Sequence, residues 1–111
     1  MNKKKLDNIL QELRRGTLVM VVLINLNKPE YGYSLVTKLQ DAGIAIEQNT
    51  LYPLLRRLEK DGLLESSWDT SESRPRKYYV ISDDGKEMLK IILKEWNRSN
   101  ASINKMLEEE G

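Results

Sequence analysis

The chain has 111 residues, of which 40% are hydrophobic and 32% are charged, and it contains no cysteine and no histidine. This length fits one domain and leaves too little chain for a second independent core. Without cysteine or histidine, the chain lacks the commonest ligands of transition metals and the commonest general base, and it has no glycine-rich phosphate loop. We therefore expect neither an enzyme nor a protein with a metal or another cofactor.

The formal net charge is only +1, which by itself speaks against a nucleic-acid-binding protein. Any such function must therefore depend on where the charges lie. Residues 1–5 are mostly basic, but charged residues interrupt the apolar stretch that follows them. This pattern fits neither a signal peptide nor a membrane span, so we expect a cytoplasmic protein with no membrane partner.

The first half of the sequence predicts three helices from apolar residues at helical spacing. They cover residues 6–26, 31–42 and about 48–61, and the last two end at glycines that are suited to helix C-caps. Gly16 inside the first helix indicates either close helix packing or a local break. Pro53 is expected in or near the first turn of the third helix, where its missing backbone donor costs little.

The second half predicts a β-hairpin and one more helix. Residues 63–68 and 77–82 are strand-like, and the stretch between them, 69–76, contains no aliphatic or aromatic residue. Ser82 is a suitable N-cap for a last helix that runs from residue 83 to about 107. The order of elements is therefore helix, helix, helix, hairpin, helix.

The aromatic residues of this hairpin are expected to contribute mainly to packing. Trp68 ends the first strand and is predicted to pack against the domain. Tyr78 and Tyr79 alternate along the second strand, so at least one of them should lie in the core rather than at a binding surface.

Two helices joined by a short turn and followed by a hairpin are typical of a winged helix-turn-helix, in which the second helix of the pair enters the major groove of DNA. The predicted fold class is therefore mainly α with a small β-hairpin, with residues 1–82 as the winged helix-turn-helix domain and 83–111 as a C-terminal dimerisation helix. The exposed face of the third helix is polar and basic, and the hairpin adds three cations, a combination that suits base edges and phosphates. The predicted DNA contacts are Gln48, Asn49, Thr50, Tyr52, Arg56 and Arg57 on the helix and Arg74, Arg76 and Lys77 on the hairpin.

The length of the last helix indicates a homodimer. A helix over 83–107 would be about 37 Å long, whereas a domain of this size is only about 30 Å across. An apolar stripe that overhangs its own core must meet another molecule, and twofold pairing is the commonest solution. Such a dimer would present two recognition helices about 34 Å apart, as a palindromic operator requires. The predicted interface residues are Met88, Ile92, Trp96, Ile103 and Met106.

Several short runs together carry a resemblance to one family. They are GTL at 16–18, YGY at 31–33, NTLYPLLRRLEKDGLL at 49–64, RKYY at 76–79 and SDDG at 82–85. In this pattern, which spans about residues 14 to 90, the chain resembles the PadR family of bacterial transcriptional regulators. Tyr31 departs from the histidine often found at that position in the family.

The resemblance implies a dimeric repressor of the compact branch, which has one C-terminal helix and reads short inverted repeats. It implies helix contacts by Thr50, Tyr52, Arg56 and Arg57, and contacts by the three hairpin cations. It also implies a pocket at the dimer interface for a small planar hydrophobic ligand, lined by Trp96, Met88 and Ile92. The alternative for Trp96 is that it only packs the interface.

Two functions remain open at this point. The first is a sequence-specific repressor that a small ligand or another signal releases from DNA. The alternative is a winged-helix module that binds proteins and no operator DNA, because winged helices are also used for protein contacts and the last helix offers a partner surface.

Overall fold

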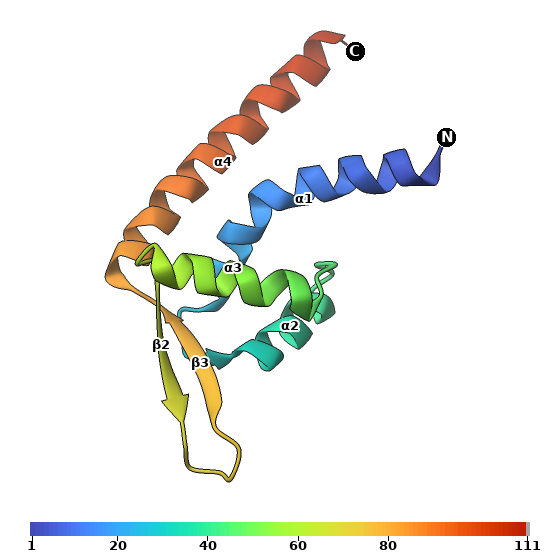
Figure 1. The fold of residues 1–111 in the computed structure, drawn as a ribbon. Coiled ribbons are helices and arrows are strands. Elements are labelled where there is room, and N and C mark those ends of the chain that lie inside the picture. Colours follow the sequence, from blue (N-terminus) through green and yellow to red (C-terminus); the bar gives the residue numbers. More distant parts are fainter. Residues whose placement is uncertain (111) are drawn as a thin grey trace.

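Four helices and a three-stranded sheet make up residues 1–110, the part of the chain that the computed structural model describes (Figure 1). The predicted fold class, mainly α with a small β-hairpin, is confirmed. In chain order the elements are α1 (Lys3–Asn25), β1 (Glu30–Tyr31), α2 (Gly32–Asp41), α3 (Gln48–Lys60), β2 (Leu64–Asp69), β3 (Arg76–Ile81) and α4 (Asp83–Glu110). We call β2, β3 and the loop between them, residues 70–75, the wing.

The core lies where the second half of α1, α2, α3 and the sheet meet. In each of these helices the buried residues fall on one side at helical spacing, so each helix turns one apolar stripe toward the others. Gly43 and Gly62 follow α2 and α3 and adopt positive φ angles of 89° and 80°. The next amide reaches back to the helix in both cases, from Ile44 to Leu39 and from Leu63 to Leu58, which completes the helix ends that the glycines predicted.

The sheet contains a strand that the sequence did not predict. Its order is β1-β3-β2, all antiparallel, and β1 pairs Glu30 with Tyr79 and Tyr31 with Tyr78. The prediction that Tyr31 begins the second helix was therefore wrong, because Tyr31 lies in β1 and α2 begins at Gly32. Two residues are too few to show an alternating pattern, and their pairing depends on backbone groups that every residue carries.

The helix ends agree with the predictions within a few residues, with one exception. Asn2 caps α1 by accepting a hydrogen bond of 2.8 Å from the Lys4 amide, and Ser82 caps α4 by accepting one of 3.0 Å from the Gly85 amide. Pro53, however, is the sixth residue of α3 and lies in its second turn, not its first. Because proline has no backbone N–H, the carbonyl group of Asn49 lacks its usual helical donor.

The two terminal helices extend away from the domain in different directions (Figure 1). The chain measures 59 × 35 × 23 Å, which is long for its size and confirms that α4 overhangs the core. A Cβ at Gly16 would meet nothing within 4 Å, so this glycine does not serve close packing in the single chain. Figure 1 instead shows α1 bending near its middle, while the helix stays continuous over Lys3–Asn25, so the predicted break is only a bend.

The start of α4 should tolerate no side chain at Gly85. A Cβ there would lie 2.2 Å from the carbonyl oxygen of Leu63 and 2.7 Å from Cγ1 of Ile81, and the backbone oxygen cannot move without shifting the strand. We expect Gly85→Ala to lower the free energy of unfolding by about 2–3 kcal/mol, measured by urea denaturation. Gly16→Ala is the matched control and should raise it by about 0.5–1 kcal/mol. Equal stability of the two variants would contradict this packing.

Candidate nucleic-acid interface

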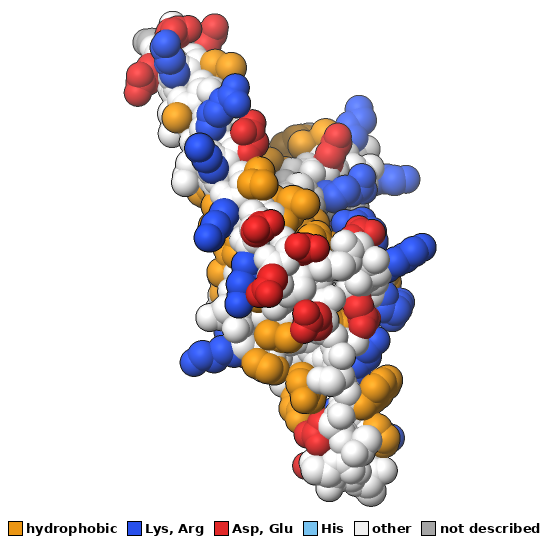
Figure 2. Space-filling view, turned by 90° about the vertical axis from the view of Figure 1, so that its left-hand side faces the viewer, with side chains coloured by type: hydrophobic (Ala, Val, Ile, Leu, Met, Phe, Trp, Pro, Cys, Tyr) orange, Lys and Arg blue, Asp and Glu red, His pale blue; other side chains and the backbone are white. Residues whose placement is uncertain are grey.

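The outer face of α3 is polar and carries unpaired cations. Leu51, Leu55 and Leu58 turn inward and are at most 2% exposed, so the opposite side of the helix faces solvent. Within residues 1–110, no carboxylate forms an ion pair with Arg56, Arg57 or Arg74. Figure 2 shows lysine and arginine side chains along its right-hand edge, which corresponds to the front of Figure 1, where α3 lies.

A groove of about 670 Å³ lies between the first turn of α2, the outer face of α3 and the wing. We call it the wing groove. Five of the nine predicted DNA contacts line it, which brings together residues from two elements that are distant in the sequence. They are Tyr52 and Arg56 from α3 and Arg74, Arg76 and Lys77 from the wing.

The other four predicted contacts do not line this groove. Thr50 lines a separate cleft of about 800 Å³ between α3, the α2–α3 turn and the first half of α1. Gln48, Asn49 and Arg57 are exposed on α3 and line neither cleft. The structure therefore divides the predicted set between the wing groove and the rest of the exposed face of α3.

The first turn of α2 belongs to the same surface, which the sequence analysis missed. Tyr33 and Ser34 line the wing groove, and Tyr33 is 66% exposed. A Cβ at Gly32 would lie 2.8 Å from Cε1 of Tyr52, so the glycine is what lets this ring lie against α2. In the sequence, the YGY run at 31–33 stands out only through the family pattern, because neither the exposure of Tyr33 nor the approach of Tyr52 to Gly32 leaves a local signal.

Glu59 joins α3 to the wing. Its carboxylate accepts a hydrogen bond from the Ser66 hydroxyl on β2 and one of 3.2 Å from Nζ of Lys77 on β3. The Ser66 hydroxyl and then Lys77 hold the pKa of Glu59 below its usual value, against the opposing effect of burial. Lys77 is half-buried, with its ammonium group 5.2 Å from the centroid of the Tyr79 ring. Its charge is therefore used partly to hold the wing.

The other cations of the wing are more accessible. Arg76 pairs with Glu72 at 3.6 Å, and both side chains remain more than half exposed. Exposed pairs of this kind contribute little and exchange partners easily. Arg74 has no such pair among the described residues and is exposed, so it is the cation of the wing most available to a ligand.

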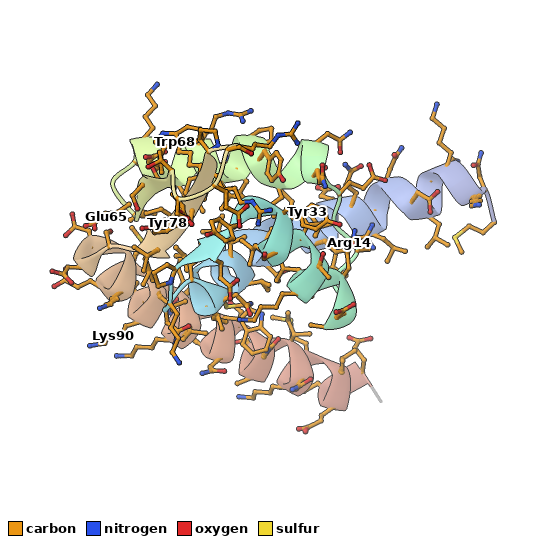
Figure 3. The ribbon with its side chains drawn as sticks, turned by 90° about the horizontal axis from the view of Figure 1, so that it is seen from below. Arg14, Tyr33, Glu65, Trp68, Tyr78 and Lys90 are labelled. Atoms are coloured by element: carbon orange, nitrogen blue, oxygen red, sulfur yellow. The ribbon has the colours of Figure 1, made fainter. Side chains whose placement is uncertain are left out.

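Trp68 corrects one prediction. It is 61% exposed rather than packed against the domain, because it lies at the outer end of β2 beyond the reach of the core. The ammonium group of Lys77 lies 6.0 Å from the centroid of the Trp68 ring. Tyr79 is buried, as predicted for one of the paired tyrosines. Trp68 and Tyr78 lie on opposite faces of the hairpin (Figure 3).

The apolar stripe on α4 is largely uncovered in the single chain. Met88, Trp96, Ile103 and Met106 are exposed, and Ile92 alone of the five predicted residues is half-buried and packs against the core.

None of the helices within residues 1–110 has the length and apolar character needed to cross a membrane. The same residues contain no group of three acidic side chains placed to hold a metal ion.

The helix pair, the wing and the cationic groove between them define a winged helix-turn-helix regulator. Residues 19–91 match the model of the transcriptional regulator PadR-like family. The chain belongs to this family, as its sequence motifs predicted. Members of the family are transcriptional regulators and not enzymes, and they bind DNA and typically form dimers.

Individual relatives agree with this assignment. The chain is similar to the crystal structure of a PadR family transcriptional regulator from Eggerthella lenta DSM 2243, with 50% sequence identity, a TM-score of 0.89 and coverage of 95% of this chain and 94% of that one. A PadR-like transcriptional regulator from Bacillus cereus strain ATCC 14579 shares 32% identity with a TM-score of 0.77, over 86% of this chain and 96% of that one. Transcriptional regulator Rv3488 from Mycobacterium tuberculosis (strain ATCC 25618 / H37Rv) is 32% identical over 81 residues, which are 72% of this chain and 76% of that protein.

The link between α3 and the wing should show in the pH dependence of stability. Because the folded state lowers the pKa of Glu59, its stabilising effect is fully present above the ordinary pKa of 4.5 and is lost as the pH falls through the lower folded-state pKa. We expect Glu59→Gln to lower the free energy of unfolding by up to about 1 kcal/mol at pH 7, and the difference to shrink toward pH 3. Urea denaturation at both pH values measures it.

The matched control is Glu65→Gln, which makes the same charge change on the exposed side of β2 (Figure 3). Among the described residues Glu65 forms no ion pair, so its replacement should leave stability almost unchanged. A pH-independent effect of Glu59→Gln would show that the carboxylate charge does not hold the wing.

Proposed function

We propose that the chain is a homodimeric, sequence-specific DNA-binding repressor that acts in the cytoplasm on a palindromic operator. The observation that carries this proposal is the wing groove, where Arg56 of α3 and Arg74 of the wing face one concave surface and pair with no carboxylate of the described part of the chain. Two unpaired guanidinium groups held by a rigid scaffold suit the phosphates and guanine edges of a duplex.

The proposed contacts divide between the two elements. Residues 48–57 of α3 enter the major groove, where Gln48, Asn49 and Arg56 can form paired hydrogen bonds with base edges. The hydroxyl groups of Thr50 and Tyr52 and the guanidinium group of Arg57 reach the phosphates beside it. Arg74 and Arg76 contact the neighbouring backbone from the wing. Lys77 contributes less to DNA binding, because Glu59 lies 3.2 Å from its ammonium group.

The proposed dimer uses residues 83–111 as the dimerisation segment. The stripe of Met88, Trp96, Ile103 and Met106 is apolar and exposed along a helix that reaches beyond its own domain. A second copy related by a twofold axis would cover this stripe with the same stripe of its own. The pairing would set the separation of the two α3 helices and with it the spacing of the operator half-sites.

Release by a small ligand is the finer part of the proposal. Trp96 is 44% exposed and follows Ile92 and Met88 at steps of four residues on one face of α4. A flat hydrophobic compound could stack on this indole at the interface and change the distance between the two recognition helices. The competing possibility, that Trp96 only packs against the partner helix, predicts no such binding.

The alternative function is a winged-helix module that binds another protein. The exposed apolar residues of α4 are the observation in its favour, because a heterologous partner could also cover them. The two functions differ in the assembly that they require. A stable homodimer occupies this surface with its own copy, whereas a monomer leaves it free.

The DNA-binding proposal predicts a salt-sensitive complex that depends on the wing groove. Duplexes retained by the purified protein from a random library supply the operator. On that duplex we expect Arg56→Ala to weaken binding by about tenfold and to relax the base preference, and Arg74→Ala to weaken binding by about tenfold and to reduce the salt dependence by about one counterion. Lys90→Ala removes the same charge from α4, on the side away from α3 in Figure 3, and should change affinity less than about twofold.

Equal losses in all three variants would mean that only the net charge matters. Failure of the library to yield any preferred duplex would reject sequence-specific binding.

The dimer proposal predicts that charge on the α4 stripe produces monomers. Ile103 and Met106 are 52% and 60% exposed, so Ile103→Glu with Met106→Glu should leave the domain folded while it places two carboxylates in the interface. Sedimentation velocity should show a dimer for the wild type and a monomer for this variant. Lys105→Glu, on the opposite face of α4, is the control that should stay dimeric.

A monomeric wild type would favour the protein-interaction module. In the dimeric protein, calorimetric binding of planar compounds that is lost after Trp96→Ala would indicate a ligand pocket, and no binding to the wild type would indicate packing alone.

A further inference from the structure

A tyrosine from outside the hairpin contacts one face of the wing at the outer end of its strands, where the wing loop begins. The Tyr31 hydroxyl donates a hydrogen bond of 2.5 Å to Oδ2 of Asp69. The Tyr31 ring also lies edge-on to the Tyr78 ring, with centroids 5.9 Å apart, and the Arg76 guanidinium group lies 5.5 Å from its centroid. Asp69 and Arg76 are the outermost paired residues of β2 and β3. Tyr31 therefore contacts both strands where the hairpin leaves the sheet.

Asp69 extends this contact into the wing loop. Its Oδ1 accepts hydrogen bonds from the backbone amide and the hydroxyl of Ser71, at 3.0 and 2.6 Å. The Ser71 hydroxyl and then the Tyr31 hydroxyl lower the pKa of Asp69 to about 2, so the carboxylate is ionised at neutral pH and can accept all three bonds. One side chain thus connects β1 to the loop that carries Arg74.

The rest of the loop has little other support. Within residues 1–110, the side-chain hydrogen bonds and ion pairs recorded for residues 70–75 reach only Asp69 and Arg76. Tyr31 itself is the N-cap residue of α2, so it moves with the helix pair. On the opposite face of the hairpin, Glu59 supplies the corresponding link from α3. The loop is therefore placed by two polar links at its base and by no apolar core.

We propose that Tyr31 is a positioning residue for DNA binding: through Asp69, its hydroxyl sets where the wing presents Arg74 relative to α3. The inference rests on the proposed function, in which α3 and the wing contact the same duplex. Because α3 occupies the major groove and the wing reaches the neighbouring backbone, the distance between the two must match the duplex. If the wing loop pivots where it joins the strands, the distance between α3 and Arg74 no longer matches the duplex, although every side chain proposed to contact DNA is still present.

A double-mutant cycle on the full chain, with the selected duplex, tests this role. Tyr31→Phe removes only the hydroxyl and keeps the ring contacts with Tyr78 and Arg76. With Arg74 present, we expect it to weaken binding about three- to tenfold, which is the effect of losing one ordinary hydrogen bond. In the Arg74→Ala background the loss should be less than about twofold, because the group being positioned is gone. Tyr78→Phe is the matched control and should leave affinity unchanged in both backgrounds.

Two outcomes of the cycle overturn the proposal. An equal loss in both backgrounds would mean that Tyr31 contacts DNA itself or acts on α3. No loss in either background would mean that the hydroxyl does not place the wing.

A second measurement needs no DNA. Nitrogen-15 relaxation of the backbone amides in residues 70–75 should show larger motions in Tyr31→Phe than in the wild type or Tyr78→Phe. Unchanged relaxation would overturn the proposal even if DNA affinity fell. If the wild type selected no duplex, the proposed function and the DNA-positioning role would both be rejected, whereas relaxation would still decide whether Tyr31 holds the wing.

Discussion

The burial of one leucine stripe on α3 determines how the rest of the molecule can be used. Leu51, Leu55 and Leu58 are at most 2% exposed, and in a helix with 3.6 residues per turn these three positions fix the direction of every other side chain. Rotation of α3 by one residue would bring polar side chains into the core, where an unpaired charge costs several kcal/mol. Packing in the core thus keeps Arg56 and Arg57 outward, although neither residue has an ion-pair partner within residues 1–110 that holds it there.

Polar contacts, and not apolar packing, hold the outer part of the wing. Only the inner ends of its strands reach the core, through Leu64, Tyr79 and Ile81. Further out, polar contacts replace apolar ones, with Glu59 on one face and Tyr31 on the other. Such contacts contribute less to stability than buried leucines, but they are directional, so they define an orientation. They also separate the cations by role, because Lys77 helps to hold the wing while Arg74 remains free of a partner among the described residues.

The periodicity of the sequence predicted the elements that have a repeating apolar pattern, and it missed the features that have no such pattern. The helices and the hairpin were predictable because apolar spacing records burial directly. β1 escaped because a two-residue strand has no period, and Trp68 was misplaced because hydrophobicity alone does not say how far the core extends along a strand. The link from Tyr31 to Asp69 joins residues 38 positions apart, with no local pattern to mark it. The composition of the proposed DNA-contacting face could thus be predicted, but its division between the wing groove and the rest of α3 required the fold.

The near-neutral net charge conceals an uneven distribution of charge over the molecule. Acidic residues end α4 at 108–110 and begin it at Asp83 and Asp84, whereas the unpaired arginines lie on α3 and the wing. A strongly basic protein would bind any duplex tightly through its phosphates, and specific sites would then compete with a large excess of non-specific ones. A chain whose charges cancel overall, but not locally, weakens that background while it keeps the attraction at the wing groove. In the proposed function, selectivity for an operator then comes from contacts whose geometry is set by the core of α3 and by the outer end of the hairpin.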